Sequence, residues 1–169
     1  VVLKMAYIAW MTNDIRLREE LCTYLPALES YNRASYIGIV LARTESKVEQ
    51  EYVLQSLGDR SADIRDEAYK VLSEMSLSPE QYQHIEELLR FKYSEMRINA
   101  INLLMKQPEA QLAASIRRLL SDKNAERRLA GLDMMKSIRN VDFLKDSYQK
   151  LLSTVREIQK PNAKEKVLI

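Results

Sequence analysis

Arginines recur in this sequence at a nearly constant interval, and this spacing constrains the fold more than any other feature. Arg65, Arg97 and Arg128 are evenly spaced to within one position, and a weaker copy at Arg33 continues the same interval toward the start of the chain. Apolar residues recur at matching positions after the three stronger copies: Ala68, Val71, Leu72; Ala100, Leu103, Leu104; Gly131, Met134 and Met135. A fixed period of roughly 30–35 residues with two helical patterns indicates stacked helix pairs, which bury their apolar faces against their neighbours.

An aspartate accompanies two of these arginines. Asp59 stands six residues before Arg65, and Asp122 stands six residues before Arg128. In the middle copy Phe91 occupies the corresponding position. An aspartate just before a helix can accept hydrogen bonds from the free amides and lies favourably at the positive end of the helix dipole. We therefore expect the pair to have a structural role rather than a catalytic one.

Leucine pairs end the second helix of two units, Leu88 with Leu89 and Leu119 with Leu120. Such a leucine pair, followed by the aspartate and by the arginine six residues later, resembles HEAT repeats, the helix-pair units of armadillo-type solenoids, over about residues 30–152. More distantly, residues 122–132 resemble the HEAT-like part of large bacterial proteins of unknown function. The resemblance implies an all-α, right-handed superhelix of about ten helices in stacked antiparallel pairs. It also implies a side-chain ladder from unit to unit: Asp59, Arg65, Arg97, Asp122 and Arg128. Because Phe91 interrupts the pattern, Arg97 would bond to Glu95 or to an aspartate of a neighbouring unit.

The repeat and the helical patterns set the expected boundaries. We predict one domain over residues 1–160 and a frayed, charged tail over 161–169. The repeat units are expected at about 30–60, 61–92, 93–122 and 123–160, preceded by helices within 1–29. The expected helices are 1–11, 15–25, 30–44, 47–57, 62–75, 79–91, 95–106, 109–121, 125–139 and 141–160.

Capping residues place several helix starts. Side chains that can accept hydrogen bonds from the first free amides are Asn13 or Asp14, Ser61, Ser78, Asn124 and Asn140. Ser78 has the strongest signal, because Pro79 and Gln81 follow it at the positions of a capping box. The segment 36–41 is rich in β-branched residues and could form a strand by local preference, but the repeat register favours a helix over 30–44.

Composition narrows the class of protein. Of 169 residues, 46% are hydrophobic and 30% charged, which is typical of a soluble globular protein. Cys22 is the single cysteine, so the chain has no internal disulfide, and we expect a cytoplasmic location. No apolar run approaches the roughly 20 residues of a membrane span. Residues 1–11 are apolar nearly all round. We expect a buried first helix and a chain cut from a longer protein that covered part of this helix.

Catalytic motifs are absent from the sequence. His84 is the single histidine, and its position beside a core residue indicates an ordinary helix-surface side chain. We expect Cys22 to be a small, buried apolar side chain. Adjacent carboxylates such as Glu19 and Glu20 diverge by about 100° on a helix and cannot face one substrate. No glycine-rich phosphate loop or nucleophile elbow occurs. We expect no enzyme activity, cofactor, metal or small-molecule substrate.

Charge is distributed unevenly along the chain. Residues 1–89 carry 9 Lys/Arg against 15 Asp/Glu, and residues 90–169 carry 17 against 9. The basic residues expected to face outward on the later second helices are Arg117, Arg118, Lys145, Lys150 and Arg156. In the resembling family these helices line the inner curve, so the five residues would form a basic concave patch for an acidic partner. They can equally be scattered solvated charges.

Two functions remain open from the sequence. The first is a non-catalytic scaffold for protein–protein interaction, because HEAT-like solenoids offer a long curved surface without built-in chemistry. The alternative is binding of a nucleic-acid backbone by the same basic patch, as in HEAT-like DNA glycosylases. Trp10 lies far from the basic units in the sequence, and few aromatic residues accompany them, so stacking on bases is difficult to supply.

Overall fold

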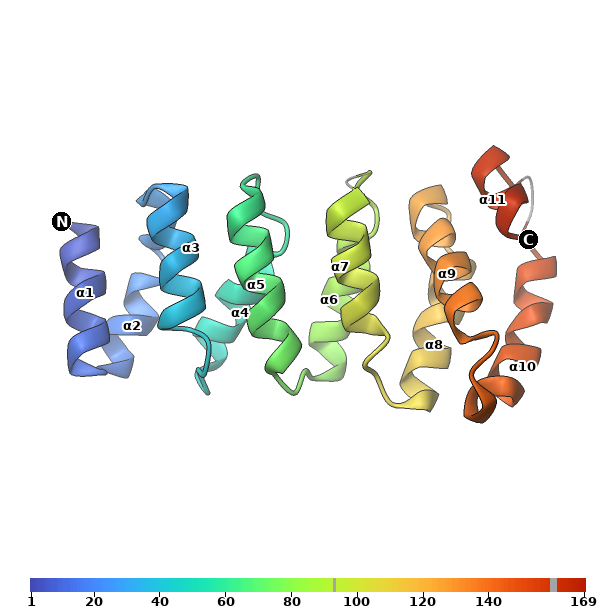
Figure 1. The fold of residues 1–169 in the computed structure, drawn as a ribbon, viewed down its shortest axis with the longest axis horizontal. Helices are drawn as coiled ribbons and strands as arrows, with labels where there is room; N and C mark the ends of the chain where they lie inside the picture. Colours follow the sequence, from blue (N-terminus) through green and yellow to red (C-terminus); the bar gives the residue numbers. More distant parts are fainter. Residues whose placement is uncertain (93, 159–160) are drawn as a thin grey trace. The chain divides into compact units, whose positions relative to one another are not determined.

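The computed structural model describes residues 1–92, 94–158 and 161–169. Across these ranges the chain is helical, with eleven α-helices, two 3-10 helices and no strand (Figure 1). The prediction of an all-α fold with packed helix pairs is confirmed. The chain divides into two compact units, residues 1–77 and 78–169, each of which is described by itself. The single repeat domain over 1–160 stays a prediction.

The first unit is built from five α-helices and one 3-10 helix. Its elements are α1 (Val2–Thr12), α2 (Ile15–Leu21), η1 (Leu25–Ala27), α3 (Ser30–Ile39), α4 (Lys47–Ser56) and α5 (Ala62–Glu74). Helix α2 packs on α1 and α4, and α5 packs on α3 and α4; Figure 1 shows α1, α3 and α5 in a row. Its fully buried core side chains include Leu21, Leu25, Ile37, Leu41, Leu54, Ile64 and Leu72.

The second unit is also built from helix pairs. Its elements are α6 (Pro79–Leu88), α7 (Ser94–Leu104), α8 (Glu109–Leu120), α9 (Ala125–Ile138), η2 (Asp142–Leu144), α10 (Lys145–Arg156) and α11 (Ala163–Leu168). The closest pairs are α6 with α7 and α8 with α9, while α8 also contacts α10, and α11 packs on α9. Fully buried side chains include Ile85, Leu89, Leu103, Leu104 and Ile116. None of the described helices is long and apolar enough to cross a lipid bilayer.

Three of the predicted caps are confirmed. Asp14 and Asn124 each accept hydrogen bonds from two first-turn amides, and Ser78 forms a reciprocal capping box with Gln81. Ser61 occupies the N-cap position of α5, but its side chain accepts no hydrogen bond from the helix. That part of the prediction is wrong. The Ser61 amide donates a hydrogen bond to the Asp59 carboxylate, which thus lies just before the helix.

Two early helices are shorter than predicted. The β-branched segment is helical, as predicted, but α3 ends at Ile39 rather than at residue 44. Helix α2 ends at Leu21 rather than at residue 25, because the chain tightens into bonds between residues three apart. The last of these joins the amide of Tyr24 to the carbonyl of Leu21 at 2.8 Å.

The predicted helix 141–160 is also shorter and starts differently. Residues Asp142–Leu144 form η2, in which the amide of Lys145 bonds to the Asp142 carbonyl. Val141, rather than Asn140, therefore precedes the first turn, and the cap predicted for Asn140 is wrong. Helix α10 ends at Arg156. The predicted end at Lys160 lies outside the described residues.

The C-terminal tail is helical, so the prediction of a frayed tail is wrong for its described part. Helix α11 begins after Asn162, whose side chain accepts a hydrogen bond from the amide of Glu165. In return, the Glu165 carboxylate accepts one from the amide of Asn162 at 2.6 Å. This capping box satisfies amides that a short helix leaves free, and it explains why so charged a segment is ordered.

Helix α1 is exposed over most of its surface, so the prediction of a buried first helix is wrong. Its buried residues are Ala6 and Ala9. Five large apolar side chains on it are exposed: Leu3, Tyr7, Ile8, Trp10 and Met11. Because the buried strip consists of small alanines, α2 covers a narrow face of α1 and leaves the larger side chains outside.

Candidate functional site

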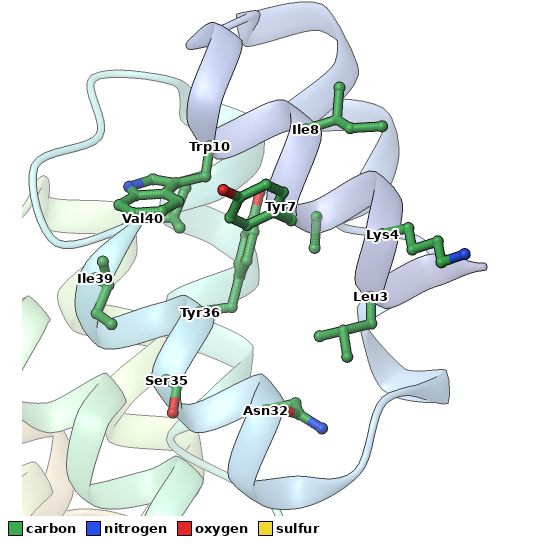
Figure 2. A pocket seen from close by; sticks show the side chains of 11 residues that line it. Leu3, Lys4, Tyr7, Ile8, Trp10, Asn32, Ser35, Tyr36, Ile39 and Val40 are labelled. Carbon is green, nitrogen blue, oxygen red and sulfur yellow. The ribbon is translucent and has the colours of Figure 1, made fainter.

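An apolar groove lies between α1 and α3. Its volume is about 650 Å3, and it is lined by Leu3, Lys4, Ala6, Tyr7, Ile8, Trp10, Asn32, Ser35, Tyr36, Ile39 and Val40. Figure 2 shows these side chains projecting from the two helices. A pocket of this size lined mainly by apolar and aromatic groups is the expected form of a binding site. The groove belongs entirely to the first unit.

The groove exists because α1 does not pack on α3 as α3 packs on α5. Helices α3 and α5 pack directly on each other, and the end of the Glu67 side chain lies 2.5 Å from where a Cβ atom at Gly38 would be. The aromatic side chains that α1 directs toward the groove remain exposed instead. Trp10 is 47% exposed and Tyr7 is 59% exposed, and their ring centroids lie 5.9 Å apart at a tilt of 58°.

The groove runs along both helices. Leu3 and Asn32 lie toward one end, where α1 and α3 begin. Trp10 and Ile39 lie toward the other end, where both helices finish. Lys4 lies beside Leu3, and its ammonium group is directed away from the side chains of α3. The surface of the groove is therefore predominantly apolar along its length.

The floor of the groove is formed partly by Tyr36, which is 6% exposed. Burial raises the pKa of Tyr36 to about 12, and the negative charge of Glu49 adds to the shift. Glu49 is fully buried and accepts two hydrogen bonds from Arg18, at 2.6 and 2.8 Å. The Thr44 hydroxyl donates to the same carboxylate. This ion pair joins α2 to α4.

The predicted basic patch is partly neutralised by neighbouring carboxylates. Arg118 donates two hydrogen bonds to Glu86, at 2.6 and 3.1 Å, and this bond to Glu86 raises the pKa of Arg118. Glu86 is 2% exposed, so the pair is a structural link between α8 and α6. Lys145 forms an exposed ion pair with Asp142 at 2.7 Å.

The other three predicted residues are exposed. Arg117, Lys150 and Arg156 form no ion pair within the described ranges. A helix turns by about 100° per residue, so Lys145 and Arg156 share one flank of α10, whereas Lys150 lies about 140° away from Lys145. The basic patch as a binding surface stays a prediction.

In the first unit, the repeat residues bond within one predicted repeat and to the next. Arg33 bonds to the Asp59 carboxylate at 2.6 Å, which joins α3 to the turn before α5. Arg65 donates to the main-chain carbonyl of Asp59 at 2.9 Å. Asp59 is therefore bonded by two arginines: its carboxylate accepts from Arg33, and its main-chain carbonyl accepts from Arg65.

The second unit repeats this arrangement with different partners. Arg128 donates to the carbonyl of Asp122 at 3.0 Å and binds the carboxylate of Glu165 at 2.7 Å. Arg97 bonds to Asp133 at 2.6 Å and to Glu126 at 3.4 Å, both within the predicted unit 123–160. These contacts join helices, and we assign them to the framework rather than to a binding site.

The residues considered for catalysis occupy separate places. Cys22 is 8% exposed, and burial raises its pKa to about 12, so its thiol stays protonated and unreactive near neutral pH. His84 lies half-buried on α6, in the other unit. Within the described ranges, no three His, Cys, Asp or Glu side chains are grouped closely enough to hold a metal ion.

Sequence reasoning missed the groove, although its signal is present in residues 1–11. This segment is apolar on every face, a pattern that by itself favours full burial. The small residues Ala6 and Ala9 mark the face that packs, and the large residues around them mark an uncovered surface. A helix with large apolar side chains on several faces predicts an exposed binding surface as readily as a core position.

Comparisons with known proteins give a family but no characterised relative. No curated protein and no solved structure matches the chain. A family model described as "Family of unknown function (DUF5724)" matches residues 1–169, the whole of the sequence. The chain therefore belongs to the DUF5724 family of unknown function.

Proposed function

We propose that the chain is a non-catalytic, HEAT-like helical-repeat scaffold that binds a helical segment of a protein partner. The observation that carries this proposal is the groove between α1 and α3, with its apolar and aromatic lining. Large exposed apolar patches on soluble proteins are characteristic of interaction sites. The arginine contacts between helices, of which that of Arg97 with Asp133 joins two successive predicted repeats, are consistent with a solenoid framework behind this surface.

A helix fits the groove better than an extended segment does. The walls are two helices of 11 and 10 residues, each about 15 Å long at 1.5 Å per residue. Backbone groups within a helix are satisfied internally, so the walls offer no free strand edge for an extended peptide to join. Recognition therefore rests on side chains, as when an amphipathic helix lays its apolar face into a groove.

The basic residues of the second unit provide weaker support for an acidic partner. Arg118 and Lys145 are already paired with carboxylates. Arg117, Lys150 and Arg156 are exposed and available, but they lie on different flanks of their helices. The alternative of nucleic-acid backbone binding draws on the same residues and has the same weakness. Binding of a partner helix in the groove requires neither an acidic partner surface nor a nucleic acid.

Trp10 makes the proposal testable, because it is the single tryptophan of the chain and lines the groove. The probe is a stapled amphipathic peptide of about 14 residues, near the length at which free helices become marginal. Its apolar stripe carries Leu and Phe. Titration of the peptide into the full chain should shift Trp10 emission to shorter wavelength and saturate.

Charge placed in the groove should abolish this response. Ile39 is 65% exposed, so Ile39→Glu should leave folding intact and weaken peptide binding at least tenfold. Ile98→Glu is the matched control, because Ile98 is 59% exposed on α7, in the other unit. A chain whose Trp10 emission does not respond to any such peptide would contradict the proposal. Equal weakening by both substitutions would also contradict it.

A further inference from the structure

Helix α1 exposes more large apolar side chains than any other described helix. Five of them are about half exposed or more: Leu3, Tyr7, Ile8, Trp10 and Met11. No other helix in the described ranges has more than two such side chains. Apolar surface gathered in this way on one element is characteristic of a contact with another protein.

The exposed apolar area is large enough for two copies of the chain to associate. Together with Ile39 on α3, the five side chains of α1 are on average just over half exposed. At about 200 Å2 for a large side chain, they expose roughly 650 Å2 in each copy. Full coverage in a pair of copies would bury roughly 1,300 Å2, which exceeds the approximately 1,000 Å2 expected of a specific interface.

The lining of the groove favours an occupant with little charge. Because the lining is predominantly apolar, a charged group laid against it would lose water without gaining a partner. Helix α1 itself has a suitable face. Lys4 is its single charged residue, and Met11 lies about 140° or more around the helix from Ala6 and Ala9, the residues that α1 buries.

We infer that the occupant of the groove is helix α1 of a second copy of the chain, and this inference rests on the proposed function. In the dimer, α1 of each copy lies in the groove between α1 and α3 of the other. Each α1 then forms a wall of its own groove through Leu3 and Trp10, and it fills the other groove through Met11. Two copies that use the same surface in this way are related by a two-fold axis.

The two α1 helices are antiparallel in this arrangement. Tyr7 is at the centre of α1, so full overlap of the helices places the two-fold axis beside Tyr7. The two Lys4 residues are then about 9 Å apart along the helix axes, whereas a parallel pair would bring like charges together. The ammonium group of Lys4 is directed away from the side chains of α3, so it stays in water at the edge of the interface.

Sedimentation velocity at several concentrations of the full chain tests for the dimer. An interface of this size corresponds to a Kd on the order of 10 μM. The chain should therefore be monomeric at about 0.5 μM and mostly dimeric at about 200 μM. The diluted chain keeps Tyr7 and Trp10 exposed, so peptide titrations and unfolding measurements are made at the lower concentration. The stapled peptide competes for the same groove and should dissociate the dimer.

Met11→Glu separates dimer formation from peptide binding. Met11 is exposed on α1 but does not line the groove, so the diluted variant should bind the stapled peptide as the unchanged chain does. Its dimer should weaken at least tenfold, because each copy would place a carboxylate in the apolar groove of the other. Ile98→Glu is the matched control on α7, in the other unit, and should leave the dimer unchanged.

A disulfide tests the antiparallel geometry. Tyr7→Cys places a thiol beside the two-fold axis, so oxidation by copper phenanthroline in air should link two copies of the concentrated chain. The native Cys22 is buried and should not react. Ile98→Cys, which lies on the other unit, should give no linked dimer. Equal linkage of the two variants would show random collision and would overturn the inference.

The possible failures can be told apart. A chain that stays monomeric at the highest concentration but responds to the peptide overturns the second copy as occupant, and the proposed function stands. A monomeric chain that does not respond to the peptide overturns both. A dimer that Met11→Glu leaves unchanged uses another surface, which overturns the inference. A monomeric chain that responds to dodecanoate alone overturns it in favour of a lipid.

Discussion

Helix α1 has eleven residues, of which Lys4 alone is charged, whereas α11 has six residues, of which three are charged. By composition, α1 would be expected to be the better packed of the two. In the structure, α1 buries two alanines and leaves its large side chains outside. Helix α11 instead inserts a fully buried glutamate, Glu165, beside Arg128.

The comparison shows that a peripheral helix is fixed in place when its side chains find complementary groups on the neighbouring helix, and that a high apolar content alone does not achieve this. Glu165 accepts two hydrogen bonds from Arg128, at 2.7 and 3.3 Å, and one from the amide of Asn162. A helix of six residues is unstable alone, so these bonds fix its position. The large side chains of α1 meet no surface shaped to receive them, and a groove results.

The largest effect should come from removing the anchor of α11. Glu165→Ala leaves Arg128, whose side chain is 14% exposed, without this partner. We expect α11 to lose about 1–3 kcal/mol of protection against local unfolding. Amide hydrogen exchange within α11 measures this directly, and Lys164→Ala, on an exposed residue of the same helix, is the control. Unchanged exchange in Glu165→Ala would show that Glu165 does not hold α11 in place.

Acid should release α11 in a smaller, graded way. Burial opposes ionisation of Glu165, but hydrogen bonds from Arg128 and the Asn162 amide outweigh it and lower the pKa below 4.5. A lowered folded-state pKa contributes stability that is present above the unfolded-state value and is lost as the pH falls through the folded-state value. The protection of the α11 amides, measured against the exchange rate of the unfolded chain at the same pH, should therefore decrease as the pH falls below about 4.5. Glu165→Gln should not show this acid dependence.

The smallest effect should come from α1. Tyr7 is 59% exposed, so Tyr7→Ser should change the free energy of unfolding by less than about 0.5 kcal/mol. Urea unfolding followed by circular dichroism measures this. A loss above about 1 kcal/mol would mean that the Tyr7 ring is buried in solution, and the contrast between α1 and α11 would disappear.

The helices themselves were largely predictable from local chemistry. Asp14, Ser78 and Asn124 cap helices as their side chains predict. Asn162 and Glu165 form the same kind of box, and their spacing is visible in the sequence, although the segment's charge and its place after Pro161 favour a frayed tail. Helix ends were harder to predict, because the last turns tighten into bonds between residues three apart.

The candidate site was less predictable than the fold. The spacing of Arg117 and Arg118 indicates exposure on a helix, but it gives no information about the residues of a neighbouring helix. Glu86, which neutralises Arg118, belongs to a different helix far back in the sequence. The groove depends in the same way on what lies beside α1: the large apolar residues of 1–11 are compatible with a core helix or with an uncovered surface, and the neighbouring helix decides between them.

The state of Cys22 has a practical consequence for labelling. Its thiol is buried and its pKa is raised to about 12, so maleimide reagents should leave the folded chain unmodified at neutral pH. A cysteine introduced at an exposed position would then be the single reactive handle for a dye or a cross-linker. The native cysteine need not be replaced beforehand.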